Sequence, residues 1–226
     1  MTTVAIHQPE YMPWLGLLDK AKKSDVFVLL DDVQFNRASL QHRAKITDGK
    51  GGSQWLTIPF VHRHPQLICE VEIADEWQSR HAEKLAAVHD YRAVLRCAGM
   101  SGGSLHEFFH SSRFLKVVDA ATVSMQFLFG AFNIAPKIVR SSELGAEGAK
   151  GDRVLDICRR LSATRYLSGR SGATYLDHEA FARAGVEIAV QNYTVPQYRE
   201  GQPAVDGLSA LDAWLTLGPE ARSLLT

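Results

Sequence analysis

Three short polar segments in this sequence combine side chains that transfer protons or bind anions. His7-Gln8 follows a short apolar run, Asp31-Asp32 follows the longer apolar run 26–30, and the small-residue segment 168–172 follows residues 165–167. If the three runs are parallel strands of one sheet, their carboxyl ends open on the same edge. We therefore expect one site at that edge.

His7 is the candidate general base or acid, because imidazole titrates near neutral pH. Asp31 or Asp32 would hold its tautomer or raise its basicity, and the three residues form the predicted catalytic set. Since adjacent side chains of an extended segment point in opposite directions, only one aspartate is expected to enter the site. The alternative interpretation is that His7 is a buried, hydrogen-bonded structural histidine.

The segment after His7 supplies candidate substrate-binding groups. Gln8 and the aromatic residues Tyr11 and Trp14 lie in a stretch that Pro9 and Pro13 keep out of regular structure. Aromatic rings there would stack on a sugar, a base or a pantetheine-like chain, or would close the end of the core. Lys20 lies one helical turn beyond Gly16 and would reach an anionic group, or else be solvated.

Further along the chain, Gln34 and Arg43 are candidates for holding an acceptor, because a guanidinium binds carboxylate or phosphate bidentately. Ser168 and Gly169 would offer backbone N–H groups to an anion. The segment matches neither the Walker loop nor the dinucleotide glycine pattern, and an ordinary loop with a helix cap is the alternative. Nucleotide binding does not follow from it.

Two histidine pairs have spacings that occur in metal sites. His62 and His64 flank an arginine, and His106 and His110 are four residues apart on a predicted helix. Neither pair has the acidic or cysteine partners that complete a zinc site, so we predict no metal and no resident cofactor.

Composition restricts the class of protein. The chain has 226 residues, with 25 Lys and Arg balanced by 25 Asp and Glu. A neutral chain has no overall field for nucleic acid, and no segment reaches the roughly 18 apolar residues of a membrane span. Cys69, Cys97 and Cys158 fit no disulfide framework, and the start of the chain resembles no leader peptide, so we expect a soluble, cytoplasmic protein.

The pattern of apolar residues predicts an α/β fold. A strand, a loop, a helix over 15–24 and a second strand open the chain as a βαβ unit. Strand–helix alternation resumes after residue 136 and includes a helix over 173–184. We expect one domain over 1–226, with a mostly parallel, Rossmann-like three-layer sheet. Two departures are predicted from it: a small antiparallel β insertion at 33–74, in which residues 67–73 extend the strands, and a helical segment at 76–132 with a break near Arg113.

The same residues resemble a known family. The opening Ile6-His7-Gln8-Pro9-x-Tyr11-x-Pro13-Trp14-x-Gly16, followed by Lys20, Asp25-Val26-Phe27-Val28 and Asp31-Asp32-Val33-Gln34-Phe35, is similar to the WbqC-like family. Further blocks that agree are Trp55-Leu56-Thr57-Ile58-Pro59, Asp156-Ile157-Cys158, Tyr166-Leu167-Ser168-Gly169, Tyr175-Leu176-Asp177, Leu208-Ser209-Ala210-Leu211-Asp212 and Gly218-Pro219-Glu220-Ala221. Where the family usually has an aromatic residue and an Asn-Arg pair, this chain has Leu40 and His42-Arg43.

The resemblance implies a role beside polysaccharide, O-antigen or specialised-metabolite biosynthesis. Our leading hypothesis is an acyl or aminoacyl transferase that forms an amide on an amino sugar or small amine, from a thioester donor or an acyl carrier protein. A nucleotide-dependent enzyme, resembling nucleotidyl-transferring folds, is the second hypothesis. The third is a non-catalytic, carrier-binding module of a biosynthetic complex.

Overall fold

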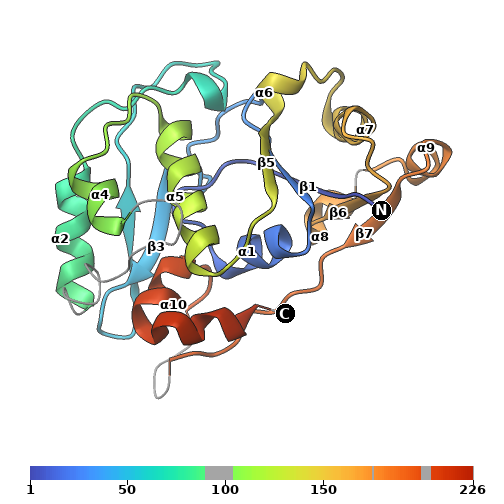
Figure 1. The fold of residues 1–226 in the computed structure, drawn as a ribbon. Coiled ribbons are helices and arrows are strands. Elements are labelled where there is room, and N and C mark those ends of the chain that lie inside the picture. The colour runs from blue at the N-terminus through green and yellow to red at the C-terminus, as the bar shows by residue number, and fades with distance from the viewer. Residues whose placement is uncertain (90–103, 175, 200–204, 226) are drawn as a thin grey trace.

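A five-stranded parallel sheet forms the centre of the molecule (Figure 1). The computed structural model describes residues 1–89, 104–174, 176–199 and 205–225, so Cys97 and Tyr175 lie outside the described residues. The strands are arranged in the order β5-β2-β1-β6-β7, and every neighbouring pair is parallel. Their bounds are β1 Thr3–His7, β2 Val26–Leu29, β5 Lys137–Arg140, β6 Arg165–Ser168 and β7 Glu187–Val190.

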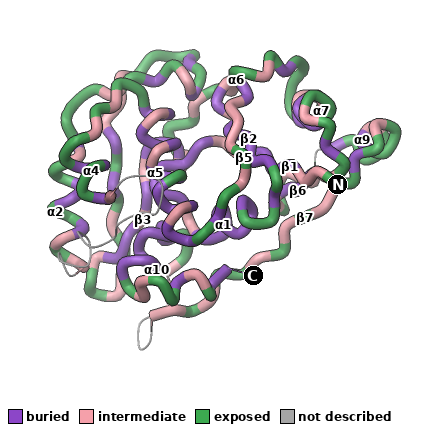
Figure 2. Tube along the Cα trace, in the orientation of Figure 1, coloured by how far each residue is buried: buried purple, intermediate pink, exposed green. Residues whose placement is uncertain are grey.

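Helices cover both faces of this sheet, and the alternating side chains of β2 divide the core between them. Phe27 and Leu29 belong to one buried cluster with α1 (Leu15–Lys22), α5 (Val117–Ala131) and α10 (Ala210–Leu217). Val26 and Val28 belong to a second cluster with α7 (Lys150–Arg160) and α9 (His178–Arg183). All four β2 residues are therefore buried, as the continuous apolar run predicted (Figure 2). The three-layer α/β prediction is confirmed.

The predicted antiparallel sheet is also present. Strands β3 (Arg43–Thr47) and β4 (Ser53–Thr57) pair antiparallel, joined by a turn in which the Asp48 carboxylate accepts hydrogen bonds from the backbone N–H groups of Lys50 and Gly52. Residues 67–73 do not extend it, contrary to the prediction. They contain the 3-10 helix η1 (Ile68–Glu70), and pairing there is limited to isolated bridges.

Short helices account for the other differences from the predicted elements. Residues 105–132 divide into α4 (Leu105–His110) and α5, separated near Arg113 as predicted. The helix expected over 173–184 is instead α8 (Arg170–Ala173) and α9, because the Asp177 side chain caps a new start by accepting from Ala180 N–H. The remaining elements are α2 (Gln78–Val88), α6 (Ser141–Leu144) and η2 (Gly218–Leu224).

Candidate functional site

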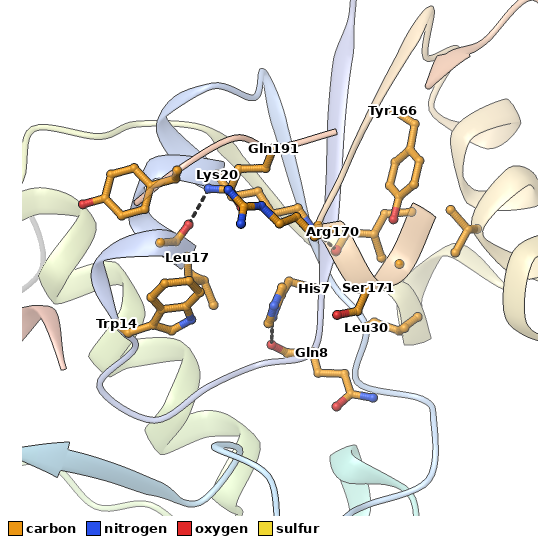
Figure 3. A pocket seen from close by; sticks show the side chains of 16 residues that line it. His7, Gln8, Trp14, Leu17, Lys20, Leu30, Tyr166, Arg170, Ser171 and Gln191 are labelled. Carbon is orange, nitrogen blue, oxygen red and sulfur yellow. Dashed lines mark hydrogen bonds between the residues drawn. The ribbon is translucent and has the colours of Figure 1, made fainter. Parts of the chain in front are cut away.

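A cavity of about 530 Å³ opens at the carboxyl ends of β1 and β6 (Figure 3). The chain adds β2 and β5 on one side of β1, and then β6 and β7 on the other side. Connections that diverge to the two sides leave a crevice between β1 and β6, where ligands of open α/β sheets bind. The lining comes from the ends of β1, β6 and β7, from α1, from Leu30 after β2 and from Val154 on α7.

His7 is the last residue of β1 and lines this cavity. Its Nδ1 is 2.9 Å from the Gln8 carbonyl oxygen. A carbonyl can only accept a hydrogen bond, so Nδ1 carries the proton and Nε2 is the acceptor nitrogen. Burial and the nearby Lys20 charge lower the pKa of His7 to about 4, although 31% of its side-chain surface remains exposed. His7 is therefore neutral at pH 7.

Glu10 is the carboxyl group next to His7. Its Oε1 is 3.8 Å from His7 Nδ1, and its Oε2 is buried without a hydrogen-bond partner in the described part of the chain. Burial raises the pKa of Glu10 to about 8, despite the opposing charge of Lys20. Sequence reasoning assigned Glu10 no role. Its spacing of three residues from His7, in a loop bounded by prolines, is the signal that could have identified it.

Lys20 brings a cation to the same cavity from α1. Its Nζ donates to the Ile6 carbonyl at 2.8 Å, and only 3% of the residue is exposed. Burial lowers the pKa of Lys20 to about 8, and the neighbouring Glu10 opposes that shift. Arg170 lines the same cavity from α8, and its Nη2 donates to Asn192 Oδ1 at 2.9 Å. Two cations with a neutral imidazole suit an anionic ligand.

The loop after β6 forms one wall. Gly169, Arg170 and Ser171 line the cavity, and a Cβ added at Gly169 would meet nothing within 4 Å. Ser168, expected to bind substrate, is buried and donates from its Oγ to the Gly169 carbonyl at 3.0 Å. Gly169 therefore lies at the cavity, whereas the Ser168 hydroxyl bonds to its own loop.

Trp14 forms the opposite wall, at the start of α1. Its ring packs on Gly16 so closely that a Cβ there would lie 2.1 Å from the ring. Gln191, which follows β7, donates from Nε2 to the Gly16 carbonyl and to Asp19 Oδ2, both at 2.8 Å. These contacts fix the aromatic wall against the sheet edge.

Tyr11 lies in the core, away from the cavity lining. It is fully buried, and its ring packs against Trp77 and Phe108. His81 Nε2 donates to the Thr57 carbonyl, so its Nδ1 accepts a hydrogen bond from the Tyr11 hydroxyl at 3.0 Å. Of the two interpretations of the aromatic loop, Tyr11 closes the core and Trp14 lines the cavity.

Asp31 and Asp32 belong to a different network. The Asp31 carboxylate accepts from the Ser142 N–H at 3.0 Å and from the Ser142 hydroxyl at 2.9 Å. Asp32 forms an ion pair with Arg153 and accepts from the Ser141 hydroxyl. Neither is among the described residues that line the His7 cavity. The structure thus brings Glu10, rather than either aspartate, to the imidazole.

The last two candidates also lie apart from His7. Gln34 donates from Nε2 to His64 Nε2 at 3.2 Å and lines a second cavity. Arg43 stacks its guanidinium 4.5 Å from the centre of the Trp55 ring and donates to backbone carbonyls in its own loop. Gln8 lines both cavities.

Comparisons with known proteins place the chain in a family. Residues 8–224 match the WbqC-like protein family. The chain belongs to that family. The chain is also similar over its full length to the uncharacterized protein Rv1507c of Mycobacterium tuberculosis, which is 25% identical over 232 residues that cover 100% of this chain and 98% of the relative. No solved structure matches this WbqC-like chain.

No described helix is both long and apolar enough to cross a bilayer. Within the same residues, no group of three or more His, Cys, Asp or Glu side chains gathers as metal ligands would.

Proposed function

We propose that this WbqC-like protein is a biosynthetic transferase that moves an acyl or aminoacyl group onto an amino sugar or another small amine. The observation that carries the proposal is a neutral His7, with Nε2 as acceptor, in a cavity that also holds Lys20 and Arg170. The family resemblance supports a setting in surface-polysaccharide or specialised-metabolite biosynthesis. A thioester of coenzyme A or of a carrier protein is the expected donor.

The proposed reaction uses each of these groups. The amine nitrogen attacks the thioester carbonyl, a C–N bond forms and the C–S bond breaks. The amine proton passes to His7 Nε2 and then to the leaving thiolate, so that the imidazole ends unchanged. Lys20 and Arg170 bind the anionic part of the donor, and the Trp14 ring packs on its apolar part.

Replacement of His7 by Gln tests the proposal. The variant keeps a polar side chain at the end of β1 but lacks the imidazole base, so turnover is expected to fall about 100-fold. Release of free thiol from mixtures of thioester donors and amines measures the rate. The matched control is His178→Gln, at an exposed position of α9. Unchanged turnover in a folded His7→Gln protein would exclude His7 from the chemistry.

Nucleotide use is a second candidate function, favoured by the strand order. A ligand crevice between β1 and β6 is where α/β sheets of this order bind nucleotides. Calorimetric titration with ATP and with nucleotide sugars tests this candidate. Heat of binding that is lost on Arg170→Ala supports it, and the absence of heat with every nucleotide removes it.

The third hypothesis, a carrier-binding module without catalysis, gains some support from the positions of Asp31, Asp32 and Arg43 outside the His7 cavity. The His7→Gln experiment separates it from the proposed transferase. A binding module predicts that donor and carrier bind without turnover in the wild-type protein as well as in the variant.

A further inference from the structure

A second cavity of about 530 Å³ adjoins the first. Its lining comes from the loop after β2, which includes Gln34 and Arg37, and from residues 62–66. Gln8 is among the lining residues of both cavities, so the two spaces are neighbours. The Gln8 Oε1 accepts from Gln41 Nε2 at 2.8 Å, which holds the amide in place.

The charge of this second cavity is one-sided. Arg37, Arg63, His62 and His64 line it, and no Asp or Glu is among the described residues of its wall. Arg63 forms an exposed ion pair with Glu72 at 3.1 Å. No described acidic side chain pairs with the exposed Arg37 within salt-bridge distance. In a chain with zero formal net charge, two arginines in a wall without carboxylates favour an anionic ligand.

A buried amide provides a second, independent observation. Gln66 is 7% exposed and lines the cavity, and its Nε2 donates to the Glu70 carbonyl at 3.2 Å. Its Oε1 is buried and accepts no hydrogen bond from the described residues. An unsatisfied buried acceptor costs about 1–3 kcal/mol, which a hydroxyl donor of a ligand would offset.

We propose that the second cavity is the acceptor subsite and binds a hydroxylated small amine that also carries a carboxylate or phosphate, such as an acidic amino sugar. Arg37 binds the anionic group, Gln66 Oε1 accepts from a ligand hydroxyl, and Gln8 borders the path toward His7. This inference rests on the proposed transferase function, since it names the acceptor class for the same reaction. The subsite can be tested by measuring ligand binding, without any measurement of turnover.

Titration of the full chain with glucuronate, glucose and inorganic phosphate, followed by NMR, tests the subsite. Glucuronate is expected to bind at least about tenfold more tightly than glucose, because one charged hydrogen bond contributes about 1.5–3 kcal/mol. If phosphate competes with glucuronate, the anionic group of the acceptor is assigned as a phosphate. If glucuronate binds and phosphate does not compete, the anionic group is assigned as a carboxylate. Equal affinity for glucuronate and glucose would overturn the proposal.

Two variants report on the two interactions separately. Arg37→Ala, at an exposed position, is expected to weaken glucuronate about tenfold and leave glucose within about twofold. Gln66→Met keeps the volume but removes the acceptor, so it should weaken both sugars. The control is Arg183→Ala on α9, where the arginine contacts Glu179. Glucuronate affinity that is the same in Arg37→Ala and Arg183→Ala contradicts the assignment.

The subsite and the transferase proposal fail in different ways. His7→Gln should bind glucuronate like the wild type, because His7 lines the other cavity. Unchanged turnover in His7→Gln would remove the proposed chemistry while the binding results stand. Unchanged glucuronate binding in Arg37→Ala would remove the subsite while the His7 result stands.

Discussion

Burial determines the protonation of the residues around the His7 cavity. His7 and Lys20 have pKa values lowered to about 4 and about 8, and Glu10 has a pKa raised to about 8. In each case desolvation, which disfavours the charged form, is the largest cause. The charge of Lys20 lowers the pKa of His7 further, whereas Glu10 and Lys20 each oppose the shift of the other. Near pH 7 the imidazole is therefore neutral, the carboxyl holds its proton and the lysine is charged. A neutral base beside Lys20 and Arg170 suits the binding of an anionic donor.

Glu10→Gln is expected to stabilise the protein at alkaline pH. The unfolded carboxyl loses its proton near pH 4.5 and the folded one near pH 8. Between pH 4.5 and pH 8 the carboxyl is ionised in the unfolded state but protonated in the folded state. The wild-type protein therefore loses stability as pH rises through this range. The difference in free energy of unfolding between variant and wild type should widen by on the order of 2 kcal/mol from pH 6 to pH 9.

Urea unfolding at both pH values measures this difference. Glu179→Gln, on the exposed surface of α9, is the matched control. A gap between Glu10→Gln and wild type that stays constant from pH 6 to pH 9 would show that Glu10 is already ionised in the folded protein.

At the scale of elements, the junction between β1 and α1 shapes the first cavity. The Trp14 ring packs on Gly16, and Gln191 ties the same turn to the end of β7. Gly16 therefore has a steric role inside a helix, where alanine would otherwise be the better residue. This contact explains why the opening block that resembles the family has a glycine at position 16.

Gly16→Ala is expected to destabilise the protein although it raises helix propensity. The new methyl group would overlap the Trp14 ring, and overpacking of this kind costs about 1–3 kcal/mol. Gly169→Ala at the facing wall is the control, because its methyl group would contact nothing. Urea unfolding compares the two variants. Equal stability of both would mean that the Trp14 ring moves away without cost.

The C-terminal helix α10 ties the antiparallel sheet to the rest of the molecule. Asp212 is fully buried on α10 and accepts hydrogen bonds from Tyr198, from Arg199 and from the backbone N–H of Thr47 at the end of β3. A carboxylate removed from water is stable only with such partners. This network accounts for an aspartate in an otherwise apolar helical segment.

For the molecule as a whole, three histidines that stay neutral in the folded state make the free energy of unfolding depend on pH. His7, His42 and His81 all have pKa values lowered to about 4, chiefly by burial. His42 packs between Phe35 and Phe60. The unfolded imidazoles take up protons near pH 6.5 and the folded ones do not, so stability is lost as pH falls from 6.5 toward 4. Glu10 has the opposite effect, because its raised pKa adds stability as pH falls. Three imidazoles outweigh this single carboxyl, so a net loss of stability is expected.

His42→Leu is expected to reduce the loss of stability between pH 7 and pH 5 by about 2 kcal/mol, because it removes one of the three groups that bind protons on unfolding. Urea unfolding at the two pH values measures the slope. His110→Leu, exposed on α4, is the control. A slope in His42→Leu equal to that of the wild type would contradict a neutral, buried His42.

The alternation of apolar runs was sufficient to predict the parallel sheet, its two helical layers, the antiparallel insertion and the position of His7 at a strand end. These features depend on the local periodicity of apolar residues and on the shared direction of parallel strands, and both can be inferred from the sequence. The segment 67–73 and the division between α8 and α9 were missed, because hydrogen bonds with remote loops and a helix cap override local propensity there.

Which acid lies beside the imidazole was decided by packing between segments far apart in the chain. Asp31 bonds to Ser142, 111 residues away, and this contact takes its carboxylate out of the His7 cavity. Glu10 and Lys20 acquire unusual protonation because sheet and helices exclude water around them, and no pattern of residue types records that exclusion. Secondary structure follows from residues that are neighbours in the sequence. Burial and hydrogen-bond partners are decided only when remote segments pack together in the tertiary structure.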